Sequence, residues 1–157
     1  MLSSLVDVRK RCTDFQLTKH FNERQAAISL LRSVRKCDTL VFDRRYYSKD
    51  LLKSVHDQGA FGVWRLRINA FQGTRTFFKS WKTESNCLIS GVQCRLVKYF
   101  INGTTYVCLT NDLSLSRSQV KELYSSRWRV EESFKRLSQI SNSKRHMLSL
   151  QTCIFKK

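Results

Sequence analysis

The chain has 157 residues, about the length of one domain that buries a core of its own. Hydrophobic residues make up 41% and charged residues 26%, which excludes a disordered tail and a fibrous repeat. Lysine and arginine total 29 and acidic residues 12, and the net charge of +17 favours a polyanion as the partner.

The first predicted elements are a helix and a buried strand. Helical periodicity covers Leu17–Lys36 and places four apolar side chains on one face: Ala27, Leu30, Leu31 and Val34. The short run Thr39–Asp43 follows, and its β-branched and aromatic residues favour a buried strand that ends at an acidic residue.

A second helix and a second strand come next. Ser48 is placed to cap a short helix that Gly59 closes, and the apolar side of this helix is formed by Leu51, Leu52 and Val55. From Phe61 the period changes to two, so that apolar side chains point one way and arginines the other: Trp64, Leu66 and Ile68 against Arg65 and Arg67.

The middle of the chain is predicted to be rich in β-structure. Residues 70–90 have no clear period and are rich in Lys, Ser and Thr, which predicts a loop or an irregular insertion. Residues Val92–Leu109 predict a hairpin, because Asn102 and Gly103 form a turn pair between two β-rich arms.

The last predicted element is a long helix. Ser116 and Gln119 form a capping-box pattern that opens a helix running to about Ile140. The tail from Ser141 is basic and weakly patterned. Helices that alternate with strands, without internal repeats, predict an α/β domain.

The cysteines and the apolar runs indicate the compartment. The six cysteines include no Cys-x-x-Cys pair, which favours free thiols in a reducing compartment over a zinc site or a disulfide framework. No apolar run approaches the ~20 residues that cross a bilayer, and residues 1–11 lack the apolar core of a secretory signal. We therefore expect an intracellular protein, of a bacterial cytoplasm or a nucleus, with no membrane partner.

The final predicted helix carries one stripe of polar side chains. At about 100° per residue, Tyr124, Arg127, Glu131 and Lys135 fall within a narrow range of angles, together with Ser138. A phenol, a guanidinium, a carboxylate and an ammonium on one stripe are suited to a functional site. The alternative is a solvated face in which Glu131 pairs with Arg127 and Lys135, each pair worth a few tenths of a kcal/mol.

Asp43 is the second candidate site residue. A carboxylate at the carboxyl end of a buried strand stands where open α/β sheets place ligands and metals. The alternative is turn chemistry before the next helix. Arg44 and Arg45 beside it fit a structural ion pair or a phosphate contact equally well.

These residues resemble a known family. Residues 37–48 and Gly59–Arg65 resemble the second-aspartate region of insertion-sequence DDE transposases, in which a strand ends in Asp-Arg-Gly-Tyr. Residues 123–137 are similar to the Tyr-x2-Arg-x3-Glu-x6-Lys signature of the IS-four-like group within that family. The resemblance spans about residues 1–140.

The resemblance implies a partial RNase-H-like core that lacks its amino-terminal strands. The implied catalytic domain is residues 1–140, with a β-rich part at about 60–112 that includes an insertion before the glutamate helix, and a basic tail at 141–157. In such a core two aspartates and a glutamate hold two divalent metal ions, Mg²⁺ with Mn²⁺ as a substitute, for phosphodiester cleavage and strand transfer.

The resemblance also assigns residues to roles. Asp43 would be the second aspartate and Glu131 the glutamate, both as catalytic residues and metal ligands. The residues implied to hold DNA are Tyr124, Arg127, Lys135, Arg44 and Arg65. The implied partner is the double-stranded DNA of transposon ends, bound by a homodimer.

The chain departs from the family pattern at several positions. Neither Asp7 nor Asp14 fits the first aspartate, so the strands that carry it are expected to precede Met1, leaving an unpaired sheet edge. Arg45 replaces the glycine of Asp-Arg-Gly-Tyr, and Ser138 stands at the signature lysine, which leaves Lys135 as the lysine of the stripe.

These departures predict a fragment that does not cleave DNA by itself, because two acids replace three. The alternative function is a catalytically inactive basic DNA-binding module. A basic RNA-binding protein is disfavoured, because the aromatic and glycine motifs of the common RNA modules are absent.

Overall fold

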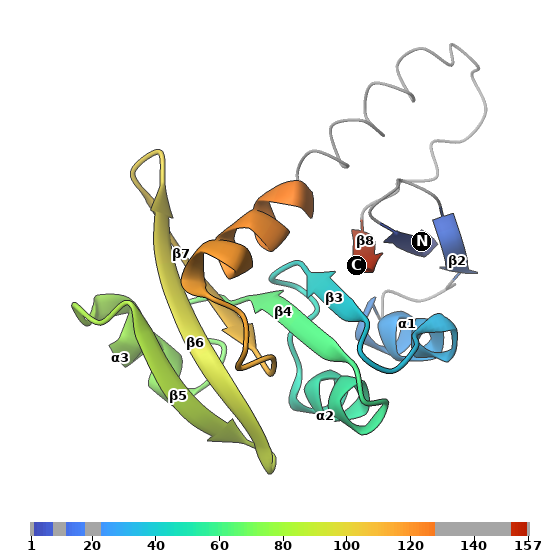
Figure 1. Ribbon diagram of the computed structural model, residues 1–157, viewed down its shortest axis with the longest axis horizontal. Helices are drawn as coiled ribbons and strands as arrows, with labels where there is room; N and C mark the ends of the chain where they lie inside the picture. Colours follow the sequence, from blue (N-terminus) through green and yellow to red (C-terminus); the bar gives the residue numbers. More distant parts are fainter. Residues whose placement is uncertain (1, 8–11, 18–22, 128–151, 157) are drawn as a thin grey trace.

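The computed structural model describes residues 2–7, 12–17, 23–127 and 152–156, which form a single sheet covered by helices (Figure 1). The elements follow in chain order: β1 Leu2–Asp7, β2 Cys12–Leu17, α1 Glu23–Leu30, the 3-10 helix Leu31–Ser33, β3 Thr39–Phe42, α2 Lys49–Asp57, β4 Phe61–Arg65, α3 Gln72–Lys79, β5 Glu84–Ile89, β6 Val92–Ile101, β7 Thr104–Thr110, a helix at 117–127 and β8 Thr152–Lys156. No described helix has the length and apolar character needed to cross a bilayer.

The sheet has eight described strands in the order β2-β1-β8-β3-β4-β7-β6-β5. Strands β3 and β4 run parallel, with α2 as the crossover between them. Strands β4, β7, β6 and β5 are joined by antiparallel pairs. The mixed sheet confirms the α/β class, since parallel strands joined by a helix lie beside a β-rich antiparallel part.

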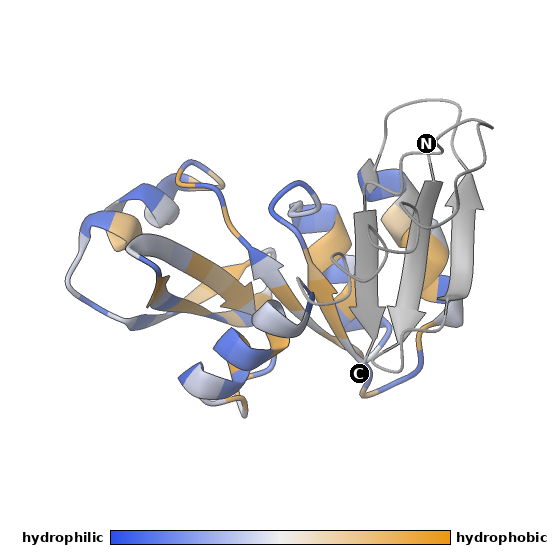
Figure 2. Ribbon diagram, turned by 90° about the horizontal axis from the view of Figure 1, so that it is seen from above, coloured by the Kyte–Doolittle hydropathy of each residue, from blue (hydrophilic) through white to orange (hydrophobic). Residues whose placement is uncertain are grey.

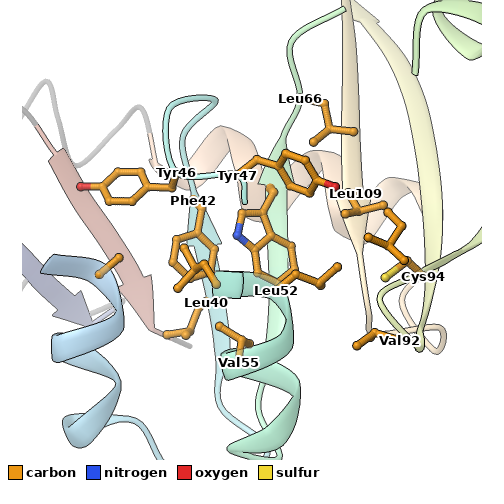
Figure 3. Close-up of a cluster of buried hydrophobic side chains, with 14 of the residues drawn as sticks. Leu40, Phe42, Tyr46, Tyr47, Leu52, Val55, Leu66, Val92, Cys94 and Leu109 are labelled. Atoms are coloured by element: carbon orange, nitrogen blue, oxygen red, sulfur yellow. The ribbon is translucent and has the colours of Figure 1, made fainter. Parts of the chain in front are cut away.

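The two faces of the sheet carry separate hydrophobic clusters. Residues from α1, α2 and α3 pack with alternate strand residues such as Leu40 and Phe42 (Figure 3). The 117–127 helix packs on the opposite face, where Val120 and Leu123 meet Val41. Figure 2 shows the same arrangement from above, with the 117–127 helix on one side of the sheet and the other helices across it. Each strand at the centre of the sheet is therefore buried on both faces.

A glycine makes room for the largest side chain of the core. The indole of Trp64 is fully buried and stacks on Phe42, with ring centroids 5.0 Å apart and ring planes 3° apart. A Cβ on Gly62 would overlap that indole. The absence of a side chain at Gly62 is therefore what allows Trp64 to lie flat in the core.

Several sequence predictions are confirmed. The face predicted for the first helix is buried, with Ala27, Leu30, Leu31 and Val34 at most 7% exposed. The β3 strand is found as predicted, and Ser48 Oγ accepts a hydrogen bond from the Leu51 amide at 3.2 Å, which caps α2. Gly59 follows α2 with a φ of +72°, which a residue without Cβ adopts readily.

The predicted hairpin and the final cap are also confirmed. Strands β6 and β7 pair as far as Ile101 and Thr104, and both Asn102 and Gly103 between them have positive φ, as in a two-residue hairpin turn. At the start of the 117–127 helix, the Ser116 amide donates to Gln119 Oε1 and the Gln119 amide donates to Ser116 Oγ.

Residues 70–90 were expected to be a loop or an irregular insertion, and this expectation is wrong. They contain α3 and β5. The helix is short and buries only Thr74 and Phe77, too few side chains to show a period in the sequence. Its first residue follows Phe71, which has no side-chain oxygen, and Thr74 Oγ1 instead accepts from the Phe71 amide at 3.2 Å.

The predicted first helix and the predicted second strand are both longer than the observed elements. The helix expected over Leu17–Lys36 spans only Glu23–Leu30, because Leu17 belongs to β2. A 3-10 turn follows to Ser33, and Val34 has an extended backbone. The strand that starts at Phe61 ends at Arg65 rather than continuing to Ile68, which is 48% exposed. Val63 is fully buried in the cluster opposite to that of Trp64, so β4 does not alternate between buried and exposed faces.

Strands β1, β2 and β8 were not predicted. The strand β8 lies in the tail that was described as weakly patterned, and it pairs in parallel with β1 and antiparallel with β3. The expectation of an unpaired sheet edge is therefore wrong for β3, because β8 occupies that edge. The position of a first catalytic aspartate stays a prediction.

Candidate active site

Asp43 is the first residue after β3, at the carboxyl end of the parallel β3–β4 pair. Its backbone carbonyl accepts a hydrogen bond from the Tyr46 amide at 3.0 Å, which closes a turn. Its side chain, 23% exposed, points to the face covered by the 117–127 helix. The strand therefore delivers a carboxylate to the edge of the sheet where α/β proteins bind ligands.

The 117–127 helix brings two further predicted residues to Asp43. The hydroxyl of Tyr124 donates a hydrogen bond to Asp43 Oδ1 at 3.1 Å. Arg127, one turn later, donates from Nη2 to the Tyr124 hydroxyl at 3.3 Å and lies 3.6 Å from Asp43 Oδ1. Residues 81 positions apart in the sequence thus form one connected polar cluster, which we call the Asp43 cluster.

Burial strengthens the electrostatic interactions within this cluster. Tyr124 is 1% exposed and Arg127 is 4% exposed, so both are shielded from water. The guanidinium carbon of Arg127 also lies 5.1 Å from the centre of the Tyr124 ring, within range of a cation–π interaction. The contact with Arg127 compensates the charge of Asp43 in the arrangement seen here.

The pKa of Tyr124 is raised to about 12, with burial as the largest cause. The carboxylate of Asp43 raises this pKa as well, whereas the positive charges of Arg127 and Arg65 lower it. The hydroxyl therefore keeps its proton at neutral pH, and Tyr124 acts as a hydrogen-bond donor to Asp43.

Arg65 joins the cluster through an aromatic neighbour. Its guanidinium carbon lies 4.5 Å from the centre of the Tyr106 ring, and that ring lies 6.3 Å from the ring of Tyr124. Tyr99 stacks on Tyr106 with centroids 5.6 Å apart. The predicted residue Arg65 therefore stands beside the Asp43 cluster on a layer of tyrosine rings.

Tyr106 and Tyr99 were not among the predicted site residues. A signal for this pair was present, because the Asn102-Gly103 turn fixes the register and places Tyr99 opposite Tyr106. Their hydroxyl environment also differs from that of Tyr124: Tyr99 contacts the sulfur of Cys108 at 3.5 Å, and burial raises the pKa of both groups.

The other predicted site residues lie apart from the cluster or outside the described part. Arg44 is exposed in the turn that follows Asp43. Arg45, at the glycine position of the family motif, has no positive φ, so this turn accepts a side chain. Glu131 and Lys135, like Ser138, lie outside the described residues.

The cluster contributes one ligand suited to a divalent cation. A carboxylate oxygen is a ligand that Mg²⁺ prefers, and Asp43 keeps part of its side chain exposed. Within residues 23–127 and the described strands, no group of three or more His, Cys, Asp or Glu side chains is placed to hold a metal. The described residues therefore provide one ligand of a possible metal site, the carboxylate of Asp43.

Comparison with known proteins identifies the family of this chain. The sequence model of the family described as "Transposase DDE domain" matches residues 2–151. The chain belongs to the transposase DDE domain family. No curated protein matches this chain.

A solved transposase structure has the same fold. The chain is similar to one in the cryo-EM structure of the piggyBac transposase synaptic complex with hairpin DNA, with a TM-score of 0.58 and 15% sequence identity. The match covers 87% of the present chain and 33% of that transposase chain. The DDE-domain chain thus has an RNase-H-like α/β fold and spans about a third of the length of that relative.

Proposed function

We propose that this chain is part of a DNA transposase catalytic domain and binds the double-stranded DNA of transposon ends. The observation that carries this proposal is the Asp43 cluster, in which a strand-end carboxylate meets Tyr124 and Arg127. The spacing of Tyr124 and Arg127 resembles the Tyr-x2-Arg part of the signature described above, and the match of the chain to the transposase DDE domain family supports this reading. The net charge of +17 supports a polyanionic partner.

Each residue of the cluster has a role in this proposal. Asp43 and Glu131 would hold divalent metal ions, Mg²⁺ or Mn²⁺. When bound, such ions supply the activation and orientation of an attacking hydroxyl for phosphodiester cleavage and strand transfer. Tyr124 donates to Asp43 and keeps its carboxylate oriented, because the phenol stays protonated.

The cationic residues would hold the DNA backbone. Arg127 contacts both Tyr124 and Asp43, so a phosphate bound by its guanidinium lies beside the carboxylate. Arg65 and Arg44 extend the positive charge along the same edge of the sheet, and Lys135 would add to it from the helix stripe. Binding to paired transposon ends by a homodimer, in an intracellular DNA-associated setting, belongs to the same proposal.

A second candidate is a DNA-binding module without catalysis. The observation that favours it is the donor set, because Asp43 is the one carboxylate of the cluster within the described residues. Two close metal ions repel each other strongly, and three carboxylates plus a phosphate normally offset that repulsion. This candidate keeps the basic surface and lacks cleavage.

Duplex binding is tested by a titration with labelled DNA at several salt concentrations. If ~6 phosphates are contacted, the affinity should fall by about a thousandfold between 50 and 200 mM salt. Arg65→Gln should weaken binding and lower the salt slope by about one, since it removes a cation beside the cluster. Arg67→Gln is the matched control, because Arg67 is exposed beyond β4 and carries the same charge. A flat salt slope would contradict DNA binding.

Catalysis is tested separately. Calorimetry with Mn²⁺ should show weaker binding for Glu131→Gln and Asp43→Asn than for the parent chain. Nicking of supercoiled plasmid in Mg²⁺ or Mn²⁺, with Asp43→Asn as the control for contaminating nuclease, distinguishes the two candidates. Nicking that Asp43→Asn abolishes supports the catalytic candidate, and DNA binding without nicking supports the binding module.

A further inference from the structure

Two cysteines lie directly opposite each other in the β5–β6 hairpin. In the antiparallel register of these strands, Cys87 on β5 is paired with Cys94 on β6. The turn between the strands is formed by Ser90 and Gly91, which both have positive φ, as in a two-residue hairpin turn. A slip by one residue would move the buried side chains of β6 to the other face, so the register is fixed. The fold therefore keeps the two cysteines opposite each other.

Both cysteine side chains lie on the same face of the sheet. Residues directly opposite each other in an antiparallel pair share a face. Cys94 is 1% exposed and belongs to the hydrophobic cluster shown in Figure 3, and Cys87 is partly buried against the same cluster. The pKa of Cys94 is raised to about 12, first by burial and then by the neighbouring Cys87 thiol. The two sulfur atoms are therefore close enough to interact.

The spacing of opposite residues in a sheet suits a disulfide. In an antiparallel pair the Cα atoms of opposite residues are about 4.5 or 5.5 Å apart, and a disulfide joins Cα atoms separated by about 4.4–6.8 Å. The Cβ atoms are about 4.5–5.5 Å apart in a sheet and about 3.5–4.5 Å apart in a disulfide, so a small approach of the strands closes the bond. Among the described strands β5 pairs only with β6, which leaves it free to move toward that strand.

The other cysteines with described side chains have no such partner. Cys37 is exposed and lies before β3. Cys108 is fully buried in the cluster on the opposite face of the sheet, where its sulfur contacts the Tyr99 hydroxyl. Within this described set, Cys87 and Cys94 are the two thiols that the strand register brings together.

We propose that Cys87 and Cys94 form a reversible oxidation site that closes to a cross-strand disulfide when the chain meets a small-molecule disulfide. The Cys87 sulfur, after loss of its proton, attacks one sulfur of the oxidant and releases one small thiol. The Cys94 sulfur then loses its proton and attacks Cys87, forming the cross-strand bond and releasing a second small thiol. The two cysteines lose two electrons and two protons, and the oxidant gains both. This inference goes beyond the proposed function and does not depend on it.

The order of the two steps follows from burial. Cys87 is partly exposed, so an external disulfide reaches it first, whereas Cys94 is shielded and is reached from Cys87. Burial raises the pKa of both thiols, which keeps them protonated at neutral pH and makes the first step slow. The pair therefore stays reduced until oxidant accumulates.

The disulfide would be labile and would act on the edge of the sheet. A bond that requires two strands to approach each other carries strain, and strained disulfides are the ones that cellular thiols reduce readily. A bond of this kind suits a reducing compartment, where protein disulfides are mostly transient. While closed, it ties the outermost described strand to β6 and opposes local opening of β5.

The test uses the parent chain and oxidised glutathione as the probe. After oxidation and alkylation of the remaining thiols, trypsin cleaves after Lys82 and Arg95, and residues 83–95 contain Cys87, Cys94 and no other cysteine. We expect this peptide to lose both alkyl groups and to be lighter by two hydrogen atoms than the unalkylated reduced peptide. Treatment with excess reducing thiol before alkylation should restore both alkyl groups. Circular dichroism checks that the chain stays folded during oxidation.

Two variants separate the pair from a single reactive thiol. Cys94→Ser removes the resolving thiol, so Cys87 should remain as a mixed disulfide that carries one glutathione. Cys37→Ser is the matched control, because Cys37 is exposed and lies outside the hairpin, and the cross-strand bond should form as in the parent chain. The result with the parent chain stands even if Cys94→Ser fails to fold.

Each outcome decides the proposal. Formation of the bond within residues 83–95 and its reversal by thiol support it. Retention of both alkyl groups while Cys37 is oxidised shows that the pair is inert core packing, and the proposal is wrong. Attachment of two glutathione molecules to residues 83–95, or a cross-link between two chains through Cys87, also overturns it. None of these results bears on DNA binding, so the proposed function is tested separately.

Discussion

The Tyr124 hydroxyl donates a hydrogen bond to Asp43 Oδ1 across 3.1 Å, and this contact ties the 117–127 helix to the end of β3. Arg127 on the same helix also lies 3.6 Å from Asp43 Oδ1, and apolar side chains such as Val120 and Leu123 hold the helix on the sheet. Apolar packing determines which face of the helix lies against the sheet. The hydrogen bond determines which polar atoms meet at the end of β3. The orientation of Asp43 therefore depends on a residue from the other half of the chain.

Replacing Tyr124 by Phe removes the hydroxyl and keeps the buried ring. We expect the free energy of unfolding to fall by about 1–3 kcal/mol, because hydrogen bonds to the charged groups of Asp43 and Arg127 are lost. Tyr99→Phe is the control, since its hydroxyl contacts the weak partner Cys108 and its loss should cost less than about 1 kcal/mol. Urea denaturation of the three proteins measures both values, and equal losses would contradict the role given to Tyr124.

The raised pKa of Tyr124 predicts a stability change at alkaline pH. The unfolded chain releases the phenolic proton near the ordinary value of 10.0, whereas the folded chain holds it up to about 12. The stabilisation by protonated Tyr124 is therefore complete below pH 10 and is lost as the pH rises through about 12. In an absorbance titration of tyrosinate, Tyr124→Phe should remove one equivalent from the late part of the curve. Removal of an equivalent near pH 10 would show that burial does not protect this phenol.

We expect the loss of the Asn111 side chain, at the opposite end of the sheet from Asp43, to lower the stability of the fold. Its side chain accepts from the Gly62 amide at 2.7 Å and donates to the Ala60 carbonyl at 3.1 Å, so it takes the place of a paired strand beside the start of β4. Asn111→Ala leaves two buried backbone groups without that partner, and we expect a loss of about 2–4 kcal/mol. Asn86→Ala, on the exposed side of β5, should change stability by less than about 0.5 kcal/mol. Chemical denaturation with both variants is the measurement.

Two glycines should respond in opposite ways to the same substitution. Gly62→Ala forces a methyl group into the space of the Trp64 indole, and we expect a loss of about 3 kcal/mol or more, with altered tryptophan fluorescence. Gly73→Ala meets its nearest neighbour, the ring of Phe71, at an ordinary 3.6 Å. Because Gly73 lies in α3 without a positive φ, alanine there should raise stability by about 0.5–1 kcal/mol. Thermal melts that rank the two variants in the reverse order would contradict the packing described for Gly62.

The sequence predicts best those elements whose ends are determined by residues close together in the chain. The Asn102-Gly103 turn and the Ser116–Gln119 cap each involve residues within three positions, and both are found. The helix α3 was missed because its cap is a threonine inside the helix and its buried face has two residues. The strand β8 was missed because a strand in this place is defined by the edges of β1 and β3, which are distant in sequence.

The candidate site is predictable in part for the same reason. The stripe of Tyr124 and Arg127 follows from helix arithmetic, and the strand-end position of Asp43 follows from the apolar run before it. Their contact joins residues 81 positions apart, which periodicity does not reveal and the family spacing suggests. The tyrosine layer beside Arg65 was not predicted, because it depends on the register of the β6–β7 hairpin, which places Tyr99 opposite Tyr106.

The place of β8 in the sheet has a consequence for synthesis of the chain on the ribosome. Within the sheet, β1 and β2 connect to β3 only through β8, although they are made more than 130 residues earlier. At ~5–20 residues per second, about 7–30 seconds pass between the appearance of β2 and that of β8. During this interval the edges of β1 and β3 present unpaired amide and carbonyl groups to other nascent chains and to chaperones. The time for which the emerging protein is open to mispairing is thus set by when residues 152–156 leave the exit tunnel.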